Sequence, residues 1–319
     1  MTAETILAIR DLLKRARQIL ITSHIRPDGD AVGGVLALGL ALQERGQEVQ
    51  MVLNDGVPAT FRHLPGSDRV QTAPSGKYDL YLTLDCADLR RVGAALETCG
   101  QPDINIDHHI TNQKFGRINL IEPEAVATSS ILARYLKQWE LPLTKAVAAN
   151  LVTGIVTDTL GFRTPNTTPE ALRQVADLME LGVNMPELYY RGLISRTFPA
   201  ARYWGAGLAS LQRDDGLVWA TLRLADRQIA GYNGNDDADL INVIASIDDC
   251  RIKMIFVEQE NGTVKVSWRT QEADLDVSQI AQQFNGGGHP GAAGADVPGT
   301  LEDVQARVLA ATRRALSHQ

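Results

Sequence analysis

The sequence is poor in cysteine, and the three cysteines that it has, Cys86, Cys99 and Cys250, stand far apart. An odd number of separated cysteines predicts neither a disulfide framework nor a Cys-x-x-Cys metal site. The chain also lacks an apolar run of the roughly 20 residues that span a bilayer. Its first residues do not combine a basic segment, an apolar run and a small-residue cleavage site. We therefore expect a cytoplasmic protein without a membrane role.

Positive charge is in short supply as well. The chain has 31 Lys and Arg against 38 Asp and Glu, which gives a net charge of −7. Binding of long DNA or RNA depends on many Lys and Arg side chains that neutralise phosphates. This balance argues against a broad surface for long nucleic acids, and any nucleic-acid substrate should be short or held through metal ions.

What the chain does have is the length and pattern of a two-domain α/β protein. With 319 residues of ordinary globular composition, it exceeds what one compact core normally holds. Its first half alternates strand-like runs with helical patterns, which predicts a mostly parallel sheet flanked by helices. The expected strands are Ile19–Ser23, Val49–Leu53, Leu80–Leu84 and Ile104–Ile106. The expected helices are 31–44, 129–139, 146–157 and 168–181.

A second, smaller α/β domain is expected in the rest of the chain. A mixed segment with Pro186 and Pro199 precedes new strand-like runs at Leu217–Leu224 and Ile252–Val257. The predicted boundaries are 1–185 for the first domain, 186–212 for the linker and 213–319 for the second domain.

Acidic and imidazole side chains follow several of the expected strands. The first strand ends in a His24-x-x-x-Asp28-x-Asp30 pattern, the third in Asp85, and the fourth in Asp107-His108-His109. Carboxyl ends of parallel strands meet at one edge of a sheet, where binding crevices form. Asp158 is expected at the C-terminal end of the helix 146–157.

These residue types indicate a site for two divalent ions. Carboxylates and imidazoles without thiolates favour Mn²⁺, with Mg²⁺, Fe²⁺ or Co²⁺ as substitutes. More ligands are present than one ion needs, and two ions 3.5–4 Å apart suit in-line attack on a phosphoryl centre. Hydrolysis of a phosphate ester is the leading reaction class. The competing interpretation is that these residues are helix caps and turn residues.

The same motifs resemble the DHH phosphoesterase superfamily, and the run from Gly286 to Gly294, Gly-Gly-Gly-His-Pro-Gly-Ala-Ala-Gly, resembles the signature of the DHHA1 domain. Together the motifs cover nearly the whole chain and are most similar to the nano-RNase type. The resemblance implies one manganese on His24, Asp28 and Asp85. It implies a second on Asp30, Asp85, His108 and Asp158, with Asp85 bridging.

Further roles rest on the same resemblance. His109 becomes the group for the substrate phosphate or leaving oxygen, and Asp107 orients an imidazole without binding metal itself. In the second domain, Arg269 resembles a substrate-binding arginine, whose fork suits phosphate. The consecutive residues Gly286, Gly287, Gly288 and His289 can bring backbone N–H groups close to an anion.

The expected function is hydrolysis of oligoribonucleotides a few residues long, or of short DNA, together with release of phosphate from 3′-phosphoadenosine 5′-phosphate. A cleft between the two domains would favour short substrates. Alternatives are a phosphodiesterase for cyclic dinucleotides or pApA and a non-catalytic nucleotide sensor, while a pyrophosphatase or polyphosphatase ranks lower. The sequence is compatible with a homodimer and leaves open the cleavage polarity, the base preference and the choice between RNA and DNA.

Overall fold

The computed structural model describes residues 3–317 and divides into two compact units, Met1–Ser195 (unit 1) and Arg196–Gln319 (unit 2). Each unit has its own sheet and its own apolar core. Within the described residues, none of the helices is long and apolar enough to cross a membrane.

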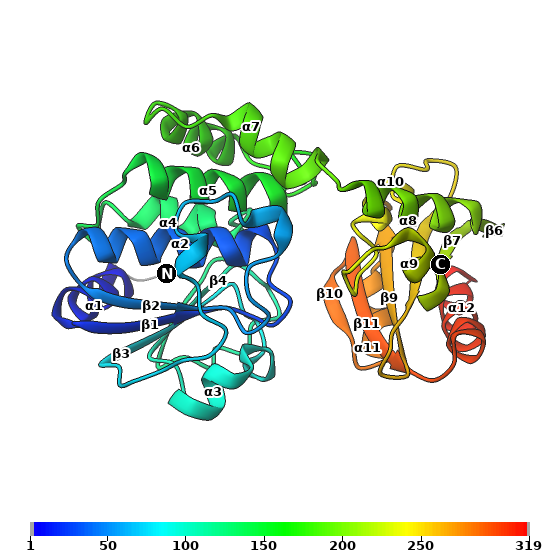
Figure 1. Ribbon diagram of the computed structural model, residues 1–319, viewed down its shortest axis with the longest axis horizontal. Helices are drawn as coiled ribbons and strands as arrows, with labels where there is room; N and C mark the ends of the chain where they lie inside the picture. Colours follow the sequence, from blue (N-terminus) through cyan, green and yellow to red (C-terminus); the bar gives the residue numbers. More distant parts are fainter. Residues whose placement is uncertain (1–2, 318–319) are drawn as a thin grey trace. The chain divides into compact units, whose positions relative to one another are not determined.

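Unit 1 is built on a five-stranded, wholly parallel sheet with the order β2-β1-β3-β4-β5 (Figure 1). The strands are β1 (Gln18–Thr22), β2 (Glu48–Val52), β3 (Leu80–Leu84), β4 (Ile104–Asp107) and β5 (Ile118–Ile121). Helices cover both faces, so the central strands are buried and read as apolar runs without alternation. The predicted fold class is confirmed. β5 was missed because it is a four-residue edge strand that is only partly buried.

The helices of unit 1 form layers on this sheet. On one face lie α2 (Gly29–Glu44) and α4 (Thr128–Tyr135), with α5 (Lys145–Asp158) packed against both (Figure 1). Beyond α5 lie α6 (Pro169–Met179) and α7 (Met185–Tyr189), and α3 (Ala94–Cys99) is on the opposite face. The helix α1 (Ala3–Arg15) contacts β5 and buries Ile9 and Leu13 in the same core. The short turns are η1 (Ala59–Phe61), η2 (Ser67–Arg69) and η3 (Leu89–Val92).

Close contact between α2 and α5 depends on a glycine. A Cβ atom at Gly33 would lie 2.5 Å from the carbonyl oxygen of Asn150, so a larger residue would push the helices apart. This contact fixes the N-terminal turn of α2 relative to the C-terminal half of α5. The predicted helix 129–139 ends at Tyr135, whereas α5 ends at Asp158 as expected.

Unit 2 contains a six-stranded mixed sheet with the order β10-β11-β9-β8-β7-β6, in which only β7 and β8 are parallel. Its strands are β6 (Gln212–Asp214), β7 (Leu217–Leu222), β8 (Ile252–Glu258), β9 (Thr263–Thr270), β10 (Gly287–His289) and β11 (Ala292–Pro298). Its helices are α8 (Phe198–Ala209), α9 (Leu224–Ala230), α10 (Leu240–Ile244), α11 (Val277–Gln282) and α12 (Leu301–Ser317). One face of the sheet packs against α8, α9 and α10, and the other against α11 and α12.

The predicted linker 186–212 is helical for most of its length. It contains most of α7, the π-helical turn η4 (Tyr190–Ile194) and all of α8. Because α8 buries Ala200 and Tyr203 in the core of unit 2, it is part of that unit. The two units divide at Ser195, inside the predicted linker.

Candidate metal centre

The candidate site lies where the strand order of unit 1 reverses. From β1 the chain continues through α2 to β2 on one side, and from β3 it continues through α3 to β4 on the other. Because α2 and α3 cover opposite faces (Figure 1), the order reverses between β1 and β3, and in open α/β sheets ligands bind at the carboxyl ends of strands at such a point. The metal-binding candidates follow these two strands, β4 and α5.

The turn after β1 gives Asp28 two tasks. Its Oδ1 accepts hydrogen bonds from the N–H groups of Asp30 and Ala31, both at 3.0 Å, and so caps α2. Its other oxygen, Oδ2, lies 3.9 Å from Nε2 of His24. Asp28 is therefore a helix cap, and its second oxygen is placed where it could also bind a metal ion.

A first group of candidate ligands consists of His24, Asp28 and Asp85, with one ligand atom of each within 4.8 Å of the others. Nε2 of His24 is 3.6 Å from Oδ2 of Asp85. Nδ1 of His24 lies 2.8 Å from the carbonyl oxygen of Ile25. Nδ1 also lies 3.0 Å from Nη2 of Arg91, so Nε2 is the ring nitrogen that faces the carboxylates and would bind an ion.

A second group consists of Asp30, His108 and Asp158, again within 4.8 Å. Nε2 of His108 is 3.4 Å from Oδ2 of Asp158, and its Nδ1 is 3.3 Å from the carbonyl oxygen of Ala125. The imidazole of His108 is therefore arranged like that of His24, with a carbonyl behind it and carboxylates in front.

Asp85 lies between the two groups. Its Oδ2 faces His24, while its Oδ1 is 3.6 Å from Nε2 of His108 and accepts a hydrogen bond from Oγ1 of Thr128 at 3.1 Å. The backbone of Asp85 is left-handed, with φ of 52°. Such strained conformations in residues other than glycine are concentrated at functional sites, and Asp tolerates them better than most residues.

The electrostatics of the cluster show an excess of negative charge. Burial and the nearby charge of Asp85 raise the pKa of Asp30 well above its ordinary value. Burial and the charges of Asp30 and Asp28 do the same for Asp158. A divalent cation would oppose both shifts, because it replaces repulsion between carboxylates with attraction to the ion. These oxygen and imidazole donors suit a hard divalent ion.

His109 is held by Asp107. Nδ1 of His109 is 2.7 Å from Oδ1 of Asp107, and the same oxygen accepts the backbone N–H groups of His108 and His109. Burial lowers the pKa of His109, but the hydrogen bond to Asp107 and the charges of Asp107 and Asp85 outweigh burial and raise it to about 10. In the metal-free protein, this shift favours the imidazolium form of His109 at neutral pH.

This charge state can be measured in the metal-free protein. We expect His109 to titrate near pH 10 in an NMR pH series, and an Asp107→Asn variant to titrate several pH units lower because the charged acceptor is gone. Since the folded pKa is raised above 6.5, the stability from this pair is complete below pH 6.5 and is lost as pH rises through 10. A His109→Gln spectrum assigns the resonance. Titration near 6.5 in the wild-type protein would contradict the assignment.

Two residues at this site escaped the sequence analysis. Nη2 of Arg91 lies 3.0 Å from Nδ1 of His24, and Thr128 contacts Asp85. Arg91 lies in the connection after β3 and Thr128 at the start of α4, where no spacing singled them out. The only signal was the Thr-Ser-Ser run at residues 128–130, which is typical of a helix start.

In unit 2, the predicted substrate residues lie across three neighbouring strands. Arg269 of β9 is opposite Ala292 of β11, which is opposite His289 of β10, so the three share one face of the sheet. Nη1 of Arg269 donates to the carbonyl oxygen of Trp268 at 2.9 Å, which holds the guanidinium. The short side chain of Ala292 leaves room between the guanidinium of Arg269 and the imidazole of His289.

The glycine-rich run is a β-hairpin in which the glycines differ in their surroundings. A Cβ at Gly286 would lie 2.2 Å from the carbonyl oxygen of Gly294. Gly288 has φ of 144° and a Cβ there would lie 2.4 Å from the carbonyl oxygen of Ala292. Gly287 has neither constraint, because a Cβ there would meet nothing within 4 Å. Gly287 is on the same face as His289. Packing therefore explains the glycines at 286 and 288 but not at 287.

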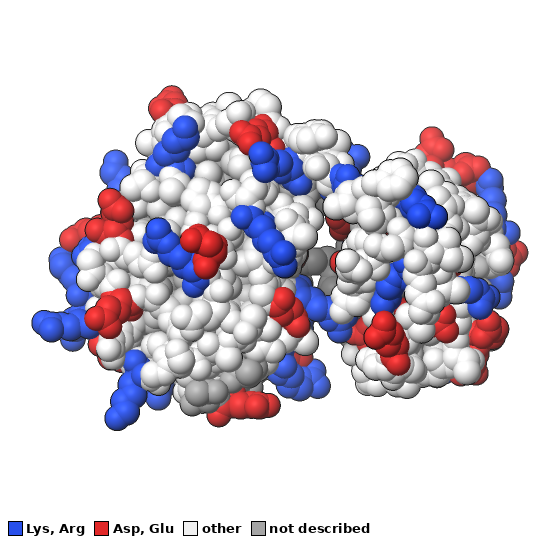
Figure 2. Space-filling model, in the orientation of Figure 1, with Lys and Arg blue, Asp and Glu red and all other residues white. Residues whose placement is uncertain are grey.

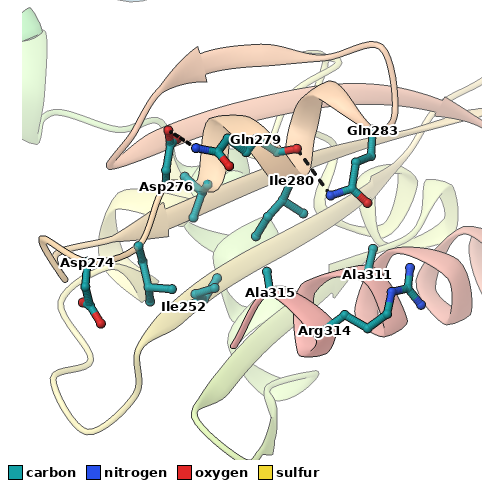
Figure 3. A pocket seen from close by; sticks show the side chains of 11 residues that line it. Ile252, Asp274, Asp276, Gln279, Ile280, Gln283, Ala311, Arg314 and Ala315 are labelled. Atoms are coloured by element: carbon teal, nitrogen blue, oxygen red, sulfur yellow. Dashed lines mark hydrogen bonds between the residues drawn. The ribbon is translucent and has the colours of Figure 1, made fainter. Parts of the chain in front are cut away.

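A groove of about 450 Å³ in unit 2 lies apart from these residues. It runs between α11 and α12, with Gln279 and Asp276 joined by a 3.1 Å hydrogen bond on one rim and Ala311 and Ala315 on the other side (Figure 3). Its lining contains no histidine and none of the predicted site residues. We do not assign the chemistry to it.

Comparison with protein families agrees with this geometry. Residues 18–155 match the DHH family, N-terminal domain, and residues 225–317 match the DHHA1 domain. The bifunctional oligoribonuclease and PAP phosphatase NrnA of Thermus thermophilus is 35% identical over 305 residues, which are 94% of this chain and 90% of that protein. The protein of the same name from Bacillus subtilis is 24% identical and covers 88% of this chain and 89% of its own length.

Among solved structures, an exopolyphosphatase-related protein from Bacteroides fragilis has a TM-score of 0.87 and 24% identity. The match covers 99% of this chain and 96% of that chain. At this level of identity, the likeness establishes a shared fold and nothing more specific.

Proposed function

The chain belongs to the DHH family of phosphoesterases and carries a C-terminal DHHA1 domain, and we propose that it hydrolyses short oligoribonucleotides and dephosphorylates 3′-phosphoadenosine 5′-phosphate with two Mn²⁺ ions. The observation that carries this proposal is the pair of candidate ligand groups on either side of Asp85. The activities in the name of the Thermus thermophilus relative support the choice of substrates.

The proposed ligands are those named from the sequence. His24, Asp28 and Asp85 would hold one ion, and Asp30, Asp85, His108 and Asp158 the other. When bound, the ions would activate a water molecule and neutralise charge on the reacting phosphate. The protein itself supplies His109, which would donate a proton to the phosphate or leaving oxygen, and Asp107, whose Oδ1 lies 2.7 Å from Nδ1 of His109 and fixes the imidazole.

We assign substrate recognition in unit 2 to Arg269, His289 and the glycine hairpin. A guanidinium binds phosphate through two parallel hydrogen bonds. Among the described strands, β10 is an edge strand that pairs with β11, so its outward-facing N–H groups would be the backbone donors, whereas the N–H of Gly286 already donates to the carbonyl oxygen of Ala281 at 2.9 Å. The open space over Gly287 allows a ligand to approach the main chain.

Short substrates fit the charge distribution of the protein. On the face shown in Figure 2, Lys and Arg are interspersed with Asp and Glu on unit 1 and on unit 2, and no broad basic area is visible. With a net charge of −7, the chain gains little from additional phosphates of a long strand. A few specific contacts to phosphates would then determine the affinity for the substrate.

The proposal is tested with purified full-length protein, Mn²⁺ and four separate substrates. These are a diribonucleotide, a long single strand, 3′-phosphoadenosine 5′-phosphate and a cyclic dinucleotide. We expect turnover of the first and third and poor turnover of the second. Equal rates on long and short strands, or preference for the cyclic dinucleotide, would contradict the proposed substrates, and tight nucleotide binding without turnover would indicate a sensor.

Substitution of Gly287 tests the effect of the hairpin on substrate binding without disturbing the fold, because a Cβ there would meet nothing within 4 Å. We expect Gly287→Ala to unfold at the wild-type temperature but to raise KM by about tenfold, the equivalent of one lost phosphate hydrogen bond. Gly288→Ala is the contrasting variant. Its Cβ would lie 2.4 Å from the carbonyl oxygen of Ala292, so it should lower the melting temperature. An unchanged KM in Gly287→Ala would show that the hairpin does not contact the substrate.

A further inference from the structure

Thr128, the first residue of α4, contacts carboxylates of both candidate ligand groups. We propose that Thr128 is a positioning residue that fixes the Asp85 carboxylate in its bridging orientation and sets its distance from Asp30. This inference rests on the two-ion site of the proposed function. It assigns a task to a residue that is not itself a metal ligand.

The hydroxyl group of Thr128 controls the orientation of Asp85. Oγ1 donates to Oδ1 of Asp85 at 3.1 Å, and both side chains are buried. Rotation about the terminal bond of an aspartate is nearly free, so the carboxylate needs a hydrogen bond to define its plane. With Oδ1 held by Thr128, that oxygen faces His108 and Oδ2 faces His24, each at 3.6 Å from Nε2. This is the orientation that lets one carboxylate bind two ions.

The backbone of the same residue holds Asp30. The N–H group of Thr128 donates to Oδ2 of Asp30 at 2.6 Å, and the N–H group of Ser129 donates to Oδ1 at 2.9 Å. The N-cap residue of α4, Ala127, has no side chain that can accept these groups, so Asp30 caps α4 from another helix. Both carboxylates are thereby tied to one residue of one helix.

A side chain that orients a metal ligand contributes measurably to the affinity of the site for its metal ion. Loss of such an outer contact typically costs about 10-fold to 100-fold in metal binding. Thr128→Val removes the hydroxyl group and keeps the backbone N–H, so it should spare Asp30 and release Asp85. Thr128→Ser keeps both donors. Ser130→Ala is the matched control, because Ser130 lies in the same helix and its hydroxyl group bonds Gln174 outside the cluster, at 2.6 Å.

The first measurement is calorimetric titration of Mn²⁺ into the metal-free, full-length variants. We expect two ions in the wild-type protein, weaker binding of at least one ion by about 10-fold to 100-fold in Thr128→Val, and wild-type binding in Thr128→Ser and Ser130→Ala. The second measurement is electron paramagnetic resonance of the Mn²⁺-loaded proteins. A shared carboxylate couples the two spins, so Thr128→Val should lose the coupled signal that Thr128→Ser retains.

The outcomes separate this inference from the proposed function. If Thr128→Val melts at a lower temperature but binds Mn²⁺ and couples the spins as the wild-type protein does, Thr128 is only structural and the inference is overturned. A wild-type protein that takes up one ion would overturn both proposals. If coupling depends on Thr128 but the wild-type protein hydrolyses none of the substrates, the positioning role stands and the proposed substrates fall.

Discussion

Asp85→Asn is expected to lower turnover on the order of 10³-fold while the protein remains folded. Lost stabilisation of a transition state by metal ions amounts to several kcal/mol, and about 1.4 kcal/mol corresponds to a factor of ten. Burial acts to raise the pKa of Asp85, but the hydrogen bond to His24 and the charge of His109 lower it overall, so the carboxylate is ionised at neutral pH. Asparagine keeps the shape and tolerates φ of 52°, but it has lost the charge.

Asp103→Asn is the matched control for this substitution. Asp103 precedes β4, so it lies at the amino ends of the strands, away from the candidate metal ligands at their carboxyl ends. Its Oδ2 accepts a hydrogen bond from the backbone N–H of Tyr81 at 2.9 Å. Its replacement should cost about 1 kcal/mol of stability or less and leave turnover near the wild-type value. The measurements are steady-state kinetics with the diribonucleotide and Mn²⁺ binding. If Asp85→Asn retained more than a tenth of the activity with two ions bound, the bridging role would be wrong.

The proximity of the metal candidates could be predicted from the sequence because parallel strands present their carboxyl ends at one edge. His24, Asp85 and His108 follow three strands that are adjacent in the sheet, and the helical spacing of residues 146–157 correctly placed Asp158 at a helix end. That these residues bind metal stays a prediction. The sequence could not separate capping from ligation at Asp28, since the carboxylate has an oxygen for each.

Residues that act through contacts between distant segments were beyond such reasoning. Thr128 meets Asp85 and Asp30 across 43 and 98 residues of sequence, and only the packing of α4 on α2 and α5 brings them together. The glycine run shows the same limit. The resemblance predicted that its backbone N–H groups approach an anion, but pairing with β11 makes the run a hairpin, and β11 in turn pairs with residues of β9 that are more than 20 positions away.

Gly154→Ala is the second substitution with a large expected effect, because it alters fold and site together. A Cβ at residue 154 would lie 2.0 Å from Oγ of Ser129 and 2.7 Å from Oδ1 of Asp30. Either α5 moves away from α4 or the Asp30 carboxylate moves out of its place. We expect a loss of stability of about 1–3 kcal/mol, as for other overpacked interiors, together with weakened binding of the ion that Asp30 would hold.

Gly205→Ala distinguishes this clash from the general effect of removing a helical glycine. Gly205 lies in α8, where a Cβ would meet nothing within 4 Å, so alanine should raise stability by about 0.4–1 kcal/mol through the unfolded state. Thermal unfolding and Mn²⁺ titration of both variants separate the two consequences of Gly154→Ala. Lower stability with intact binding of two ions would mean that the Ser129 side chain moves away from the new Cβ and that the Asp30 carboxylate keeps its position. Loss of one ion would mean that the position of the Asp30 carboxylate depends on the close packing of α2, α4 and α5.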